Sequence, residues 1–88
     1  MKSRITRDFR TAFAALPHQI QRQAVAAYGR FRENPAHPGL HVERIHGTEP
    51  IYSVRIGLHW RALALRDDDT LYWFWIGSHA DYDRLIAQ

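Results

Sequence analysis

The chain has 88 residues, of which 45% are hydrophobic and 12% aromatic, and it carries a formal net charge of +3 at pH 7. This composition excludes a disordered protein, and the length leaves room for one domain, residues 1–88. No cysteine is present, which excludes disulfides and thiolate zinc sites. No apolar run approaches the roughly 20 residues of a membrane helix and the start lacks a secretory signal, so we expect a cytoplasmic protein with no membrane partner.

Two amphipathic helices are expected first, at residues 6–16 and 17–33. The first has Thr6 or Ser3 as a candidate N-cap, and the second begins at a proline, which the first helical position tolerates. The second ends before Asn34, because the residue before a proline avoids the helical conformation. Apolar residues recur at helical spacing in both segments: Phe9, Phe13 and Leu16, then Ile20, Ala24, Ala27, Tyr28 and Phe31.

Four strands are expected after a proline-rich loop, at residues 40–46, 51–57, 60–66 and 71–76. Within residues 51–57, Tyr52, Val54 and Ile56 share one face, which leaves Ser53 and Arg55 on the other. The last three strands have short connections and should pair as an antiparallel meander. A short C-terminal helix follows, in which Ser78 is the expected N-cap and Asp81 its capping-box partner.

These elements predict an α+β fold, with two N-terminal helices on one face of a small, mainly antiparallel four-stranded sheet. The other face is left to solvent or to a partner. If Val54 and its neighbours pack on the helices, Arg55 lies on this open face. The face of Arg61 is left undecided, because both alternating sets of residues in its strand are apolar.

Polar residues able to carry out chemistry gather on the predicted sheet. Arginine binds phosphate through paired N–H groups, and histidine transfers protons near neutral pH, typically contributing about 10²–10⁴-fold to a rate. This combination suits RNA cleavage by attack of a 2′-hydroxyl on the adjacent phosphate, which requires no metal, cofactor or covalent intermediate. The candidates are His41, Arg44, Arg55, His59, Arg61, His79 and Tyr82.

Each candidate also has a structural interpretation. The arginines suit an exposed sheet surface, His79 the first turn of the last helix, and Tyr82 a packing position. His37, His41 and His46 lack the compact spacing of a metal site, so we expect no metal. Three tryptophans suit either base stacking or a core, and the core is favoured for Trp60, Trp73 and Trp75. The arginine-rich charge (of twelve basic residues only Lys2 is lysine) fits a nucleic-acid partner but also a GC-rich genome.

Three segments, FRENPAHPGLHVERIHG, YSVRIGLHWRALA and WFWIGSHADYD, resemble the RelE/ParE superfamily of small bacterial toxins from type II toxin–antitoxin systems. The resemblance covers nearly the whole chain. It implies a small antiparallel sheet carrying two N-terminal helices, cleavage of mRNA in the ribosomal A site, and a cognate antitoxin encoded by the adjacent gene. The N-terminal strand that usually opens the sheet is expected to be short or missing.

The resemblance also implies roles for individual residues. Arg55 and Arg61 match the positions that hold the scissile phosphate, and His79 matches the general acid or base. Tyr82 lies near a terminal tyrosine of other branches, and His41 resembles a first-strand residue that assists proton transfer. RNA-binding contributions are expected from Arg44, His59 and Ser53; some relatives carry a second lysine at the position of Ser53.

Two other functions remain open on the same fold. One is a gyrase inhibitor of the ParE kind, which binds its target and cuts no RNA. The other is a catalytically degenerate protein that only binds its antitoxin.

Overall fold

The computed structural model describes residues 2–45 and 47–87. Its strands form one sheet in the order β1-β5-β4-β3-β2, in which β1 is parallel to β5 and the other neighbours are antiparallel. The α+β fold class is confirmed. In chain order the elements are β1 (Lys2–Ile5), α1 (Arg7–Ala14), α2 (His18–Glu33), the 3-10 helix η1 (Pro38–Leu40), β2 (Glu43–Arg44), β3 (Ile51–Ile56), β4 (Trp60–Asp67), β5 (Thr70–Ser78) and α3 (His79–Ile86).

The sheet has five strands where the sequence predicted four, because an N-terminal strand is present. The β1 backbone pairs along β5, and hydrogen bonds from Lys2 N to Asp69 O (2.8 Å) and from Thr6 N to Trp73 O (3.0 Å) tie its two ends. Most of its side chains are exposed, so they show no alternation of polar and apolar residues. The strand is defined by the free edge of β5, a tertiary feature that the local pattern does not carry.

The strand expected at residues 40–46 is reduced to the two residues of β2. The preceding η1 turn buries Leu40 and ends at His41, whose φ of 44° lies in the left-handed region. An extended strand cannot contain that conformation, which is why pairing begins only at Glu43. His46 lies outside the described residues.

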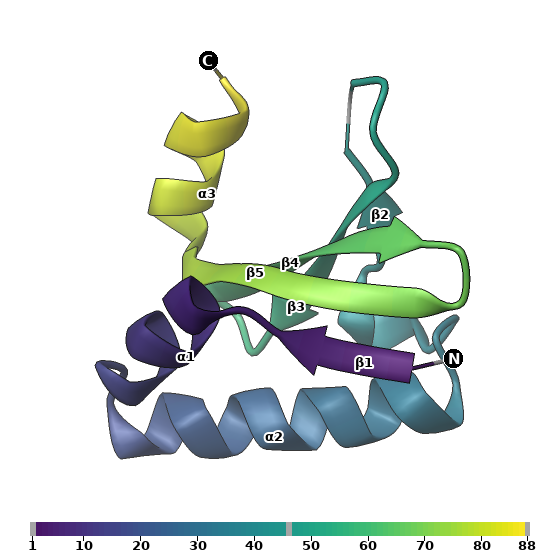
Figure 1. Ribbon diagram of the computed structural model, residues 1–88. Helices are drawn as coiled ribbons and strands as arrows, with labels where there is room; N and C mark the ends of the chain where they lie inside the picture. The colour runs from purple at the N-terminus through teal and green to yellow at the C-terminus, as the bar shows by residue number, and fades with distance from the viewer. Residues whose placement is uncertain (1, 46, 88) are drawn as a thin grey trace.

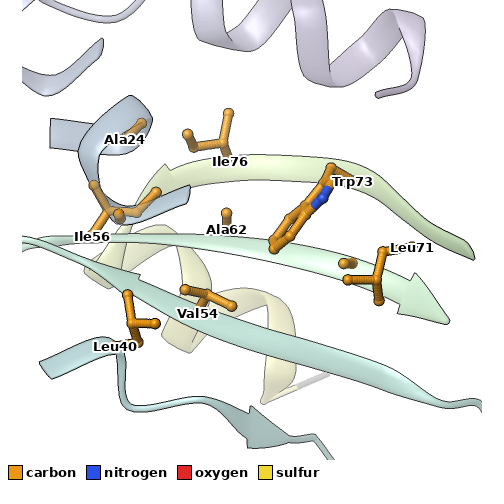
Figure 2. Close-up of a cluster of buried hydrophobic side chains, with 10 residues drawn as sticks. Ala24, Leu40, Val54, Ile56, Ala62, Leu71, Trp73 and Ile76 are labelled. Atoms are coloured by element: carbon orange, nitrogen blue, oxygen red, sulfur yellow. The ribbon is translucent and has the colours of Figure 1, made fainter. Parts of the chain in front are cut away.

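The core lies between the helices and one face of the sheet. In Figure 1, α2 runs along one side of the sheet, while α3 rises on the other side. Ala24 and Ala27 are buried, and their small side chains allow α2 to lie close to the strands. Figure 2 shows Val54, Ala62 and Trp73 from three neighbouring strands in this cluster. None of the described helices is long and apolar enough to cross a membrane.

The alternation in β4 settles which residues face away from the core. Ala62 and Ala64 belong to the core, so Arg61 and Leu63 lie on the opposite face together with Arg55. A bulge in β5 has a further effect: Leu63 pairs with Trp75 and Ala64 with Trp73, which leaves Phe74 between them unpaired. The extra residue turns Trp75 away from the core side occupied by Trp73.

Candidate active site

Four residues that the sequence singled out meet on the face of the sheet opposite α2; we call them the Arg61 cluster (Ser53, Arg61, His79 and Tyr82). The Arg61 guanidinium donates from Nη1 to Ser53 Oγ (2.6 Å) and from Nε to His79 Nδ1 (3.4 Å). Its Cζ atom lies 5.1 Å from the centre of the Tyr82 ring, within the range of a cation–π contact. Residues from β3, β4 and α3 are thereby joined through one side chain.

The position of His79 follows from how β5 passes into α3. Ser78 Oγ accepts a hydrogen bond from Asp81 N (3.1 Å), which confirms Ser78 as the N-cap. The Asp81 carboxylate accepts from Arg84. The His79 backbone N–H donates to His59 O (2.6 Å) and fixes the start of α3 to the β3–β4 turn.

The hydrogen bonds of His79 define its tautomer. Because Nδ1 accepts from Arg61, a neutral imidazole carries its proton on Nε2. That nitrogen lies 3.5 Å from Asp83 Oδ2, one helical turn further along α3, and the His79 side chain is 46% exposed. The proton-bearing nitrogen is therefore at the surface, where it can donate to a bound group.

A second arginine–histidine pair lies on the next strand. Arg55 and Arg61 are directly opposite each other on β3 and β4, which places their Cα atoms roughly 4.5–5.5 Å apart. Their guanidinium groups diverge: Arg55 donates from Nε to Gly57 O (2.8 Å), and its Nη1 lies 3.1 Å from His41 Nε2. The second amino group, Nη2, donates to no described residue. It is available to an oxyanion.

Burial separates the two arginines. Arg61 is only 8% exposed and Ser53 is fully buried, whereas Arg55 is half-buried and His41 is exposed. We expected Arg55 and Arg61 to act alike on a phosphate. In the structure Arg61 is committed to neighbours within the protein, and Arg55 is the one with free donors near the surface.

The remaining candidates contribute less. Arg44 lies on the edge strand β2, where it is exposed and opposite Tyr52, and among the described residues its side chain makes no hydrogen bond or ion pair with either arginine–histidine pair. His59 is exposed and contributes its carbonyl oxygen to His79. Within residues 2–45 and 47–87, no three His, Asp or Glu side chains are grouped to hold a metal.

The sequence analysis missed one contributor to the site, Asp83. The signal in the sequence was that Asp83 follows His79 by four residues. Residues four apart in a helix lie on the same side, so Asp83 lies next to His79 once α3 begins there.

The fold and the sequence both match proteins of known family. The ParE-like toxin domain model matches residues 18–84. Among solved structures, the archaeal RelE–RelB complex from Pyrococcus horikoshii superimposes with a TM-score of 0.71 at 17% identity, covering 88% of this chain and 92% of that one. The RelB–RelE antitoxin–toxin complex from Methanococcus jannaschii gives 0.72 at 16% identity, covering 91% and 95%.

A copper-bound mutant toxin from Helicobacter pylori gives a TM-score of 0.64 at 16% identity, covering 92% of this chain and 97% of that one. No curated protein matches the sequence significantly. At these identities the superpositions establish the RelE fold, and the family model, which spans most of the chain, establishes the family. The chain belongs to the ParE-like toxin domain family of the RelE/ParE superfamily.

Proposed function

We propose that this toxin-domain protein is the toxin of a type II toxin–antitoxin system and cleaves mRNA on the ribosome by metal-independent acid–base chemistry. The observation that supports it most is the pair of arginine–histidine contacts, Arg61–His79 and Arg55–His41, on directly opposed residues of adjacent strands. Two imidazoles and an arginine with free donors are the groups that phosphodiester cleavage by a 2′-hydroxyl requires.

In the proposed reaction, Arg55 binds the scissile phosphate through its free N–H groups. A phosphate oxygen that takes the Nη1 hydrogen bond releases His41 Nε2, which then accepts the 2′-hydroxyl proton. The 2′-oxygen attacks phosphorus and the bond to the 5′-oxygen breaks. The neutral His79 stabilises that leaving oxygen by donating a hydrogen bond from Nε2–H, and the oxygen takes its proton from water. Protonated His41 then returns its proton to solvent. The products are a 2′,3′-cyclic phosphate and a free 5′-hydroxyl.

Arg61 and Tyr82 serve this reaction by positioning. Arg61 holds the tautomer and orientation of His79 through the contact to Nδ1, and Tyr82 packs over the guanidinium. Asp83 faces the proton on Nε2 and orients the ring from the other side. Hydrogen bonds to one ring nitrogen of a catalytic histidine commonly fix its tautomer and its orientation in this way.

The test of the nuclease is induction of the toxin without its antitoxin, followed by primer extension on cellular transcripts. His79→Ala should relieve growth arrest and lower the yield of new ends phased to the A site by roughly 10²–10³-fold, because the leaving oxygen loses the hydrogen-bond donor that stabilises it. His18→Ala is the matched control: His18 is an exposed histidine at the start of α2, outside the site. If His79→Ala remained as toxic as His18→Ala, the role assigned to His79 would be wrong.

The burial of Arg61 beneath Tyr82 favours one rival function, an antitoxin-binding protein that cuts no RNA. Wild-type protein that binds the product of the adjacent gene, yet yields no new RNA ends and no growth arrest, would establish that rival in place of the nuclease.

An antitoxin partner is supported by a surface on the helix side of the molecule. An apolar hollow of about 300 Å³ opens among β1, α1, α2 and the sheet. At its rim Val25 is 65% exposed and Ile5 is 47% exposed. We propose that the antitoxin covers this apolar hollow, because the P. horikoshii and M. jannaschii proteins of the same fold are complexes of RelE with RelB.

A further inference from the structure

A second hollow, of about 490 Å³, lies between α2, η1 and the β3–β4 turn. Its polar lining comes from Gln23, Arg30, His37 and Arg55, and no Asp or Glu is among the described residues that line it. Two positively charged guanidinium groups therefore share one recess without a carboxylate to neutralise them. We call this recess the Arg30 hollow.

The hydrogen bonds inside the Arg30 hollow leave it rich in donors. His37 Nδ1 accepts from Gly39 N (3.1 Å), so a neutral His37 carries its proton on Nε2 and can donate it. The Arg30 guanidinium makes no hydrogen bond or ion pair with any described residue. Arg55 retains the free Nη2 amino group described above. A recess with surplus donors and unneutralised positive charge fits a phosphate group.

Arg55 connects this hollow to the reaction site. It is opposite Arg61 on the sheet, yet its guanidinium turns toward Gly57 and His41 and also lines the Arg30 hollow. A nucleotide chain with one phosphate at Arg55 and His41 can thus place its neighbouring phosphate in the recess. Arg30 and His37 would meet that second phosphate.

We infer that the Arg30 hollow is a second phosphate subsite, which binds the phosphodiester adjacent to the one cleaved and so sets the track of the RNA strand. The inference rests on the proposed nuclease function for the identity of its ligand. Of the residues that support it, only Arg55 also belongs to the proposed reaction site. In this proposal Arg30 and His37 bind the second phosphate and touch no atom that reacts.

The test uses RNA that cannot be cleaved. A 2′-O-methyl dinucleotide has one phosphodiester and the corresponding trinucleotide has two, and neither has a 2′-hydroxyl to attack. Binding is followed by NMR titration of the full chain. The amide signals of Gly39 and Gly57 report on the Arg30 hollow, and that of Gly77, opposite Arg61 on the sheet, reports on the Arg61 cluster.

For the wild-type chain we expect the trinucleotide to bind roughly three- to tenfold more tightly than the dinucleotide and to shift the Gly39 and Gly57 signals. Arg30→Gln should remove this gain, because the second phosphate loses its cation. Arg22→Gln is the matched control, with the same charge change on the same helix at an exposed position outside the hollow. It should keep the gain.

Two results would overturn the subsite. One is an equal loss of the gain in Arg22→Gln and Arg30→Gln, which means that only diffuse charge matters. The other is binding of inorganic phosphate alone to the hollow as tightly as the trinucleotide, which makes the ligand a free anion. If the wild-type protein cleaves no RNA but still binds the trinucleotide more tightly than the dinucleotide, only the nuclease proposal is wrong. If the wild-type protein cleaves RNA but Arg30→Gln leaves the tighter trinucleotide binding unchanged, only the subsite is wrong.

Discussion

At the scale of single residues, Arg61 is the side chain on which the site depends. It is nearly buried, and its charge is balanced by hydrogen bonds to Ser53 and His79 and by the face of Tyr82. A buried guanidinium without such partners would be strongly unfavourable. Only the planar fork of arginine reaches two acceptors while stacking on a ring, so lysine is a poor substitute.

Arg61→Lys should therefore lower the free energy of unfolding by about 1–3 kcal/mol, because a buried ammonium group leaves one of the two acceptors unpaired. Urea denaturation measures the change. Arg66→Lys is the control on the same strand: Arg66 is exposed, and the change should stay within about 0.5 kcal/mol. Equal effects of the two substitutions would show that the Arg61 contacts do not contribute to stability.

At the scale of elements, the site is built where β5 meets α3. The bulge at Phe74 places Trp75 on the site face, where its ring lies 6.4 Å from that of Tyr82. Gly77 leaves room for this indole: a Cβ atom at Gly77 would come within 2.8 Å of Trp75. The packing of Trp75 against Tyr82 thus supports the ring that covers Arg61.

A pair of glycine substitutions tests this packing. Gly77→Ala should destabilise the protein by about 1–3 kcal/mol, because the new methyl group displaces the indole. Gly29→Ala, in α2, meets nothing within 4 Å and should stabilise by about 0.5–1 kcal/mol through the better helix propensity of alanine. Urea midpoints of the two variants should move in opposite directions. A neutral or stabilising Gly77→Ala would contradict the close fit of Trp75.

At the scale of the whole molecule, the sheet separates two surfaces of different chemistry. Figure 1 shows α3 on one side of the sheet and α2 on the other. The Arg61–His79 contact lies on the α3 side, and the apolar hollow lies on the side of α1 and α2. Exposed apolar side chains that gather around a recess are typical of a surface covered by a partner. On the proposals above, the antitoxin would cover the apolar hollow, and the RNA would lie on the α3 face and reach past Arg55 into the Arg30 hollow beside α2.

Val25→Glu should weaken binding to the purified product of the adjacent gene by about tenfold or more, because it places a charge within the proposed apolar contact. Isothermal titration calorimetry measures the affinity. Since Val25 is mostly exposed in the free protein, its stability should change by less than about 0.5 kcal/mol.

Ile86→Glu is the control for this experiment. Ile86 is 47% exposed at the end of α3, away from the apolar hollow. If both variants bound the antitoxin like the wild type, the antitoxin would cover a different surface.

The sequence by itself determined the helical hairpin, the central strands, the N-cap at Ser78 and the fold class, because these follow from residue spacing within short segments. It left Thr6 and Ser3 as alternative caps of the first helix, and the structure shows that Thr6 is the cap. The sequence did not predict β1, whose place depends on the edge of β5, nor the shortening of β2, which depends on the backbone of His41. The sequence also supplied the candidate residues, but it did not show which arginine contacts which histidine. The tertiary structure decided that Arg61 turns inward to His79 while Arg55 turns outward to His41, because side-chain contacts between strands and α3 depend on packing that no single segment encodes.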